Sequence, residues 1–214
     1  MFFYNVIPGH DLGIAIIVLT VVIRLIFTPL SLKAQRSQKA MNALGPKIKE
    51  IKEKFKKDQV AQGSAIMQLY KENGVSPVAG CVPILIQLPI LIALYQVFIA
   101  GLKPESLSML YPFIQTPETI NSSFLGLFNI TTSNKFLALI AGGLQYLQSK
   151  QSAQMMSAGS AAPEMAALNK QMTYFFPILI VAIGWNLSAG LILYWVATTA
   201  YSIGEQFYLI KTSK

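Results

Sequence analysis

The sequence has very few of the side chains that enzymes and metal centres use. Among 214 residues it contains one cysteine, one histidine and nine acidic residues. A single cysteine excludes an internal disulfide, and His10 belongs to no H-E-x-x-H motif. The chain has no G-x-S-x-G motif and no pair of aspartates in an apolar stretch. These absences argue against an intramembrane protease, and we expect a protein that is not an enzyme, with no cofactor and no bound metal.

Charged residues are also missing from four long stretches, apart from one arginine. These stretches are Leu12–Leu32, Val78–Leu102, Phe136–Ser149 and Gln171–Gly204. Apolar residues make up 53% of the chain and charged residues 12%, and the mean hydropathy is +0.50. Stretches of this length and composition are typical of helices that cross a bilayer. The sequence therefore predicts one integral membrane domain.

The single charge in these stretches is Arg24, near the middle of the first predicted span. A guanidinium at this depth costs roughly 2.5 to 3.5 kcal/mol on insertion scales. No acidic residue lies in any of the apolar stretches, so Arg24 has no apparent counter-ion at its own depth. It therefore either contacts water or bonds to backbone carbonyls that Pro29 or Pro83 leave free.

Small and polar residues on the same helical face as Arg24 favour water. They follow one another at steps of three, four or seven residues: Gly13, Thr20, Arg24, Thr28 and Ser31. This spacing predicts that one face of the first span borders a water-filled cavity, while the opposite face meets lipid.

A strongly basic segment follows, in which apolar residues keep a helical spacing. Met41, Leu44, Ile48, Ile51 and Phe55 alternate at three and four residues, and a second helical pattern runs from Ile66 to Asn73. Two short helices with matching apolar seams predict an antiparallel hairpin in water, within residues 33–77. Its lysines either attract anionic lipid or bind a ribosome or nascent chain; the main cluster is Lys47, Lys49, Lys52, Lys54, Lys56 and Lys57.

The remaining apolar stretches predict four more spans within residues 78–211. Gln87 in the second span lies at about the depth of Arg24, and it either borders the cavity or bonds two helices together. The last stretch is too long for one span, and the sequence after Trp185 supplies a turn between two. Residues 103–135 then form an external loop and residues 150–170 a cytoplasmic loop.

Five crossings place the N-terminal residues 1–11 outside and the C-terminus inside. With the first span at residues 12–32, all basic residues except Arg24, Lys103 and Lys135 lie on the inner side. This distribution agrees with the positive-inside rule. The predicted fold is an all-α integral membrane protein with five transmembrane helices and a cytoplasmic antiparallel helical hairpin. Because the positive charge follows membrane topology, we expect no role in reading nucleic acid.

Four motifs in order resemble the YidC/Oxa/Alb membrane protein insertase family. They are VVIRLIFTPL in the first span, the charged hairpin, CVPILIQLPILIALYQVF in the second span and NLSAGLILYW in the last pair. The resemblance extends from about Gly13 to Gln206. It is a resemblance to the short members of the family, which have no large periplasmic domain. It implies a hydrophilic groove that opens to the cytoplasm and to lipid.

The resemblance also implies which residues form the groove. Arg24 matches the family's arginine, Gln87 its second-span glutamine, and Gln145 its third-span glutamine, with Gln148 as the alternative. Trp185 matches the groove tryptophan, although an aromatic belt is the default position for Trp185, Tyr194 and Trp195. We add Thr20, Thr28 and Tyr201 as further groove residues.

The function implied is that of an insertase, chaperone and translocase of nascent membrane proteins in a bacterial plasma membrane. Its expected partners are nascent membrane proteins and anionic lipid, with the ribosome, the signal recognition particle pathway and the Sec translocon as further candidates. A small polytopic channel or transporter is the alternative. Such a protein would be expected to show internal repeats or facing charges, and the sequence shows neither.

Overall fold

A computed structural model describes residues 2–76, 82–100, 120–157 and 163–212. Most of the predicted external loop and part of the predicted cytoplasmic loop lie outside these residues, as does Cys81. The helices are α1 (Phe2–Val6), α2 (Leu12–Ala43), α3 (Gly45–Lys54), α4 (Gln59–Glu72), α5 (Val82–Ala100), α7 (Lys135–Ser157), α8 (Pro163–Gly184) and α9 (Ala189–Thr212). Two short strands, β1 (Ser123–Phe124) and β2 (Phe128–Asn129), pair antiparallel.

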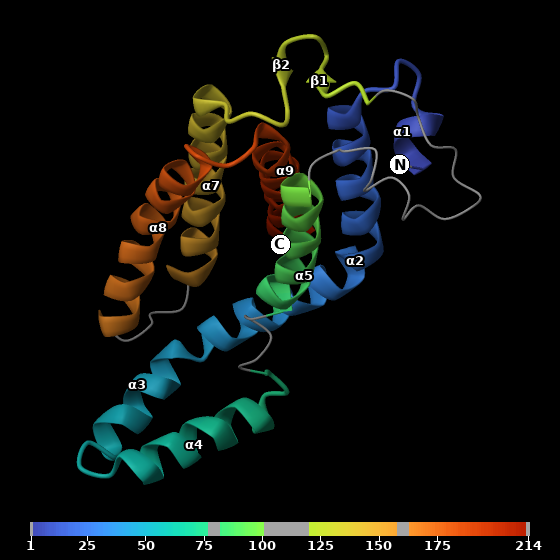
Figure 1. Ribbon diagram of the computed structural model, residues 1–214. Coiled ribbons are helices and arrows are strands. Elements are labelled where there is room, and N and C mark those ends of the chain that lie inside the picture. Colours follow the sequence, from blue (N-terminus) through green and yellow to red (C-terminus); the bar gives the residue numbers. More distant parts are fainter. Residues whose placement is uncertain (1, 77–81, 101–119, 158–162, 213–214) are drawn as a thin grey trace.

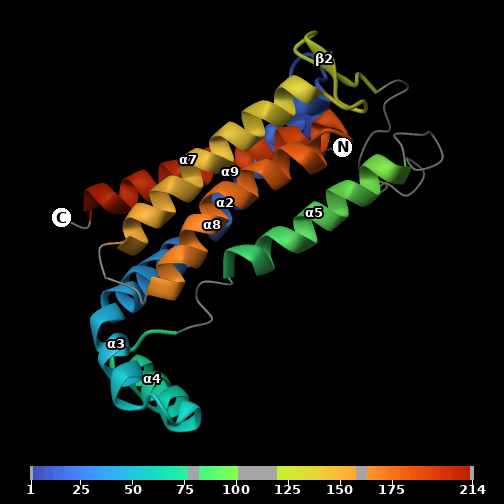
Figure 2. The same cartoon turned by 90° about the vertical axis from the view of Figure 1, so that its left-hand side faces the viewer.

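The long helices α2, α5, α7, α8 and α9 form a bundle, and α3 and α4 extend from one end of it (Figure 1). These helices include most of each stretch predicted as a membrane span, but α7 and α8 also take in residues 150–157 and 163–170 of the predicted cytoplasmic loop. Among the described helices, α2 contains a segment long and apolar enough to cross a membrane, whereas α5 and α8 contain shorter apolar segments, Gln87–Phe98 and Gln171–Gly184. The termini lie at opposite ends of the bundle, and the C-terminus lies at the end nearer the hairpin (Figure 2).

Helix α2 does not end where the predicted span ends at residue 32, but continues without a break to Ala43. The basic sequence from Lys33 to Ala43 is rich in Lys, Arg, Gln and Ala, which favour helix in water as well as in lipid. At its other end Asp11 caps the helix, because its Oδ1 accepts a hydrogen bond from the Ile14 N–H at 3.0 Å.

Of the residues predicted to form the hairpin, 33–43 belong to α2, and 45–54 and 59–72 form α3 and α4, which pack against each other. Helix α3 begins at Gly45 with a proline in its first turn, where a missing N–H costs nothing. Asp58 caps α4 by accepting hydrogen bonds from the N–H groups of Val60 and Ala61. These caps fix the turn between the two helices.

Packing within the bundle is uneven. Helix α7 makes extensive contact with α8 and α9, and α2 packs along α9, whereas α5 makes much smaller contacts with α2 and α9. Figure 2 shows α5 standing apart from α7 and α8. The main core cluster is therefore built by α7, α8 and α9, from Leu137, Ala141, Ile180, Ala189, Ile192 and Leu193.

Hydrogen bonds of backbone groups join the segments at the end of the bundle away from the hairpin. The N–H groups of Ala189 and Gly190 donate to the carbonyls of Thr132 and Ile130, at 2.7 and 2.8 Å. Asp11 also accepts a hydrogen bond from the Leu125 N–H, in the turn between the strands, at 2.6 Å. Ile130 is fully buried beneath this turn. The strands and the loop after them therefore connect α2 to the start of α9.

Two adjacent glycines on α7 provide a test of this packing. A Cβ at Gly142 would collide with the Val181 side chain of α8, whereas a Cβ at Gly143 would meet open space. We expect Gly142→Ala to destabilise the bundle by about 1–3 kcal/mol because the α7–α8 contact is overpacked. Gly143→Ala should be neutral or slightly stabilising, since alanine favours helix. Thermal unfolding in detergent measures both, and equal midpoints would contradict the close approach.

Candidate functional site: a polar cavity between the helices

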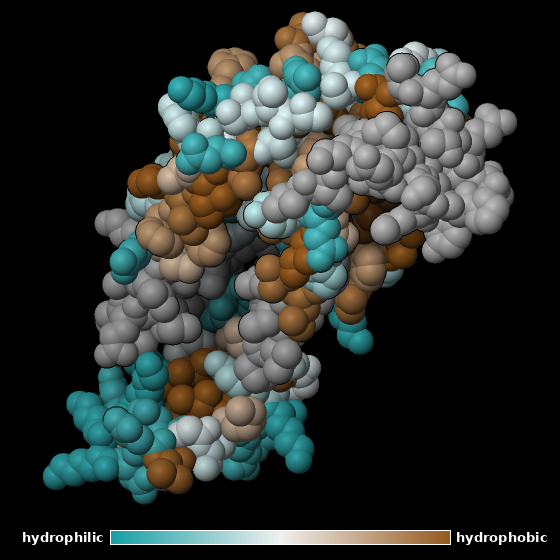
Figure 3. Space-filling model, viewed as in Figure 1, coloured by the Kyte–Doolittle hydropathy of each residue, from teal (hydrophilic) through white to brown (hydrophobic). Residues whose placement is uncertain are grey.

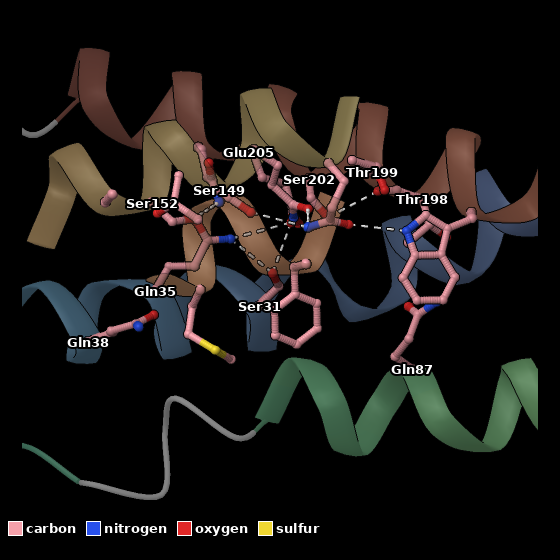
Figure 4. A pocket seen from close by; sticks show the side chains of 18 of the residues that line it. Ser31, Gln35, Gln38, Gln87, Ser149, Ser152, Thr198, Thr199, Ser202 and Glu205 are labelled. Atoms are coloured by element: carbon pink, nitrogen blue, oxygen red, sulfur yellow. Dashed lines mark hydrogen bonds between the residues drawn. The ribbon is translucent and has the colours of Figure 1, made fainter. Parts of the chain in front are cut away.

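A cavity of about 540 Å³ lies between the long helices of the bundle. Its polar lining comes mainly from α2, α7 and α9: Arg24, Ser31, Gln35, Gln38, Gln87, Gln145, Gln148, Ser149, Ser152, Thr198, Thr199, Ser202, Glu205 and Gln206. Figure 4 shows several of these side chains pointing toward one another from different helices. In the space-filling view this part of the surface is hollowed, with hydrophilic residues inside and hydrophobic residues along the sides (Figure 3).

Arg24 and Gln87 meet in this cavity. The Arg24 Nη2 donates a hydrogen bond to the Gln87 Oε1 at 3.1 Å, joining α2 to α5. Arg24 is half-buried and lines the cavity, so its guanidinium is bonded on one side and faces the open space on another. The bond provides one polar partner for a charge that would otherwise be costly among apolar helices.

Glu205 is a cavity residue that the sequence analysis missed. It is 7% exposed, and its Oε2 accepts hydrogen bonds from the Ser31 Oγ at 2.9 Å and the Gln35 Nε2 at 3.4 Å. It also interacts electrostatically with Arg24. The expectation that no acidic residue lies at the depth of Arg24 remains a prediction, because Glu205 is bonded to Ser31, which follows Arg24 by seven residues on α2. Glu205 directly follows the uncharged stretch that ends at Gly204, so a search of that stretch for acidic residues did not include it.

A helical pattern in the sequence could have revealed Glu205. Thr198, Ser202 and Glu205 follow one another at four and three residues, so they share one face of α9. All three are buried and line the cavity. The stripe on α9 is the counterpart of the predicted stripe on α2, and the two stripes face each other.

Thr28 and Tyr201 lie beside the cavity and brace α2 against α9. The Thr28 hydroxyl donates to the Arg24 carbonyl at 2.8 Å, so its oxygen accepts from the Tyr201 hydroxyl at 2.6 Å. Thr20 is 2% exposed, and its hydroxyl donates to the Ile16 carbonyl at 2.6 Å. None of these three side chains is among the described residues that line the cavity.

The two candidate glutamines of the third predicted span both line the cavity. Gln145 Nε2 donates to Gln148 Oε1 at 3.2 Å, and Gln145 Oε1 accepts a hydrogen bond from the Trp195 Nε1 at 3.1 Å. The tryptophan that lines the cavity is Trp195 of α9. Trp185 lies away from it, 40% exposed, with the Lys135 Nζ 5.3 Å from its ring centroid.

The lysine cluster of the hairpin lies apart from the cavity, at the hairpin end of the molecule (Figure 1). Lys47, Lys49, Lys54, Lys56 and Lys57 are exposed, and Lys52 is half-buried. Within the described part of the chain, no group of three His, Cys, Asp or Glu side chains has the arrangement of a metal site. The two functional regions predicted from the sequence are thus separate surfaces.

Chemically, the cavity presents hydrogen-bond donors and acceptors inside a helical bundle. One cation, one carboxylate, several amides and several hydroxyls line it, and apolar side chains such as Leu88, Met172 and Phe176 complete its wall. Such a lining can replace water around the backbone groups of an unfolded peptide segment. The arrangement fits a binding site for polar peptide better than a site for bond chemistry.

Comparisons with known proteins agree with this geometry. Residues 2–214 match the family model for the 60Kd inner membrane protein. The membrane protein insertase YidC of Fusobacterium nucleatum is 32% identical over 201 residues, which cover 94% of this chain and 87% of that protein. The membrane protein insertase MisCA of Bacillus subtilis is 35% identical over 209 residues, covering 94% of this chain and 71% of that protein.

A solved structure is also similar. A crystal structure described as an active YidC insertase with the first transmembrane domain resolved matches with a TM-score of 0.63 and 27% identity. The match covers 97% of this chain but 43% of that one. Several other relatives named YidC are matched over only about a third of their length, such as that of Magnetococcus marinus at 34%. The chain belongs to the 60Kd inner membrane protein family, the family of the YidC and MisCA membrane protein insertases.

Proposed function

We propose that this protein inserts nascent membrane proteins into a bacterial plasma membrane by binding their polar segments in a hydrated cavity within the bilayer. The observation that carries the proposal is the cavity of about 540 Å³ around Arg24, enclosed by helices whose outward faces are apolar. The names of the relatives, membrane protein insertases, support the same function.

In the proposed topology α2, α5, α7, α8 and α9 each cross the bilayer, with the N-terminus outside and the C-terminus inside. Support comes from the bundle itself, in which these helices lie side by side with the termini at opposite ends (Figure 2). The position of the basic hairpin at the end near the C-terminus also agrees with the positive-inside rule.

An incoming chain places a short polar segment in the cavity, where Arg24, Gln87 and Gln145 replace part of its hydration. An unpaired amide in an apolar medium costs roughly 2–7 kcal/mol, so each group satisfied here lowers the barrier to crossing. The adjoining apolar segment then leaves between the helices into lipid. Its burial, at about 25 cal/mol per Å², supplies the driving force without a nucleotide.

The proposed partners follow from the two surfaces. The cavity receives nascent membrane proteins, and the lysine cluster of the hairpin attracts anionic lipid headgroups or the chain delivered by the ribosome, the signal recognition particle pathway or the Sec translocon. Attraction of a basic cluster to anionic headgroups is worth about 1 kcal/mol per lysine near the surface.

The role of Arg24 can be tested with purified protein in proteoliposomes. We expect Arg24→Ala to slow insertion of a single-span client with an acidic translocated tail by about tenfold, because a charge-assisted hydrogen bond is lost. Arg24→Lys should be milder because it retains the charge. Protease protection of the translocated tail measures insertion.

Arg36→Ala is the matched control, since it removes an exposed arginine from the same helix without touching the cavity. It should behave like the wild type. Equal insertion rates for the wild type and Arg24→Ala would show that Arg24 takes no part in insertion. An ion current from the wild type in the absence of any insertion would favour a channel instead.

Hydration of the cavity can be tested with single cysteines on α7 in a Cys81→Ser background. Ser149 lines the cavity, whereas Gly143 on the same helix faces away from neighbouring side chains. A membrane-impermeant maleimide added from the cytoplasmic side should modify Ser149→Cys at least about tenfold faster than Gly143→Cys, because a thiol needs water to ionise. Comparable rates at both positions would mean that the cavity is not open to water.

The hairpin can be tested by neutralising its exposed lysines. We expect simultaneous Lys→Gln changes at positions 47, 49, 54, 56 and 57 to weaken insertion several-fold in vesicles that contain anionic lipid. In purely zwitterionic vesicles the same variant should match the wild type if lipid is the partner. A defect of equal size in both vesicles would assign the lysines to a protein partner.

A further inference from the structure

The proposed function assigns no role to the buried carboxylate of Glu205. It lies on α9 at the hairpin side of the cavity and is the one acidic residue among the described lining residues (Figure 4). Burying a carboxylate in a membrane bundle is costly unless it is paired. Its described hydrogen-bond donors, Ser31 and Gln35, are both neutral.

The two charges of the cavity lie at different depths. Helices α2 and α9 run side by side, and the contacts Thr28 with Tyr201 and Ser31 with Glu205 keep the same register. Glu205 is therefore level with Ser31, which follows Arg24 by seven residues on α2. Seven residues correspond to about 10 Å along a helix. The cavity therefore has a negative part nearer the hairpin, at Glu205, and a positive part farther from it, at Arg24.

One donor to Glu205 is held weakly enough to be replaced. The distance from the Gln35 Nε2 to the Glu205 Oε2 is 3.4 Å, at the long end of the range for a hydrogen bond. The second oxygen, Oε1, makes no hydrogen bond to any residue that the structure describes. The Gln35 amide is a neutral donor to Glu205, and a cationic side chain in the same position would pair with the carboxylate more strongly.

We propose that Glu205 binds a lysine or arginine side chain of the client, so that the cavity accepts segments in which a basic residue follows an acidic or polar one toward the cytoplasm. The client cation displaces the Gln35 amide and pairs with the Glu205 carboxylate, while Arg24 holds the acidic or backbone group ahead of it. This inference deepens the proposed function and rests on it.

The distance between the two charges sets the spacing that the client must supply. About 10 Å corresponds to roughly three residues of extended chain, at about 3.3 Å each. A client segment that enters the cavity extended therefore places its basic residue about three positions from the residue held by Arg24. Without Glu205, a basic side chain in the cavity would meet only the repulsion of Arg24.

The experiment uses three clients that differ at one position of the translocated tail, which is Lys, Gln or Glu. Insertion rates are measured in proteoliposomes for the wild type and for Glu205→Gln, which keeps the shape and an acceptor for Ser31 but removes the charge. We expect the rate ratio of the Lys client to the Gln client to fall about tenfold, the value of one charge-assisted bond. The ratio of the Glu client to the Gln client should stay constant or rise.

Two further variants keep the proposal falsifiable. Glu72→Gln removes an exposed carboxylate from α4 and should leave all ratios as in the wild type. Gln35→Ala removes the amide that competes for Glu205, and should raise the ratio for the Lys client. A uniform loss for all three clients in Glu205→Gln would assign Glu205 a structural role and overturn the proposal.

The outcome separates the inference from the function on which it rests. If the wild type inserts all three clients and Glu205→Gln leaves their ratios unchanged, the basic-residue site is wrong and the insertase function stands. If the wild type inserts none of the clients above the rate of empty vesicles, the proposed function itself fails.

Discussion

The hydrogen bond between Arg24 and Gln87 joins α2 to α5, two helices that otherwise share little contact surface. The rest of the bundle is held by apolar packing among α7, α8 and α9 and by the contact of α2 with α9. Polar groups inside such a bundle must be satisfied by one another or by water. This requirement brings the polar stripes of α2 and α9 face to face and keeps a cavity between them.

Sequence patterns predicted much of this arrangement because helical spacing is preserved in the fold. The stripe through Arg24 identified the face of α2 that borders the cavity. The sequence placed Arg24 and Gln87 at similar depth, and the structure adds a hydrogen bond between them. The sequence left Gln145 and Gln148 as alternatives, and both lie in the cavity. Residues three apart on a helix share one face, so Gln145 and Gln148 both reach the cavity and hydrogen-bond to each other.

Other features were not predicted, for reasons that differ from one residue to the next. Trp185 and Trp195 both lie in the outer half of predicted spans. Which of them lines the cavity depends on the orientation of α9 in the bundle, which directs Trp195 toward Gln145. Glu205 was missed because a carboxylate at the end of an uncharged stretch is normally expected in water. The unbroken course of α2 past residue 32 was missed because the change from apolar to basic composition was taken as a structural boundary.

At the end of the bundle away from the hairpin, Ala189 and Gly190 make main-chain hydrogen bonds and the Leu125 N–H donates to the Asp11 carboxylate. The described hydrogen bonds between long helices nearer the hairpin are made by side chains. Side-chain bonds such as Gln206 with Ser152 can exchange partners without unfolding a helix. In the proposed insertion, the helices would therefore separate more readily at the hairpin end than at the opposite end. Under the proposed function, a client would enter between helices held by exchangeable side-chain bonds, while the backbone hydrogen bonds at the far end would keep the cavity closed there.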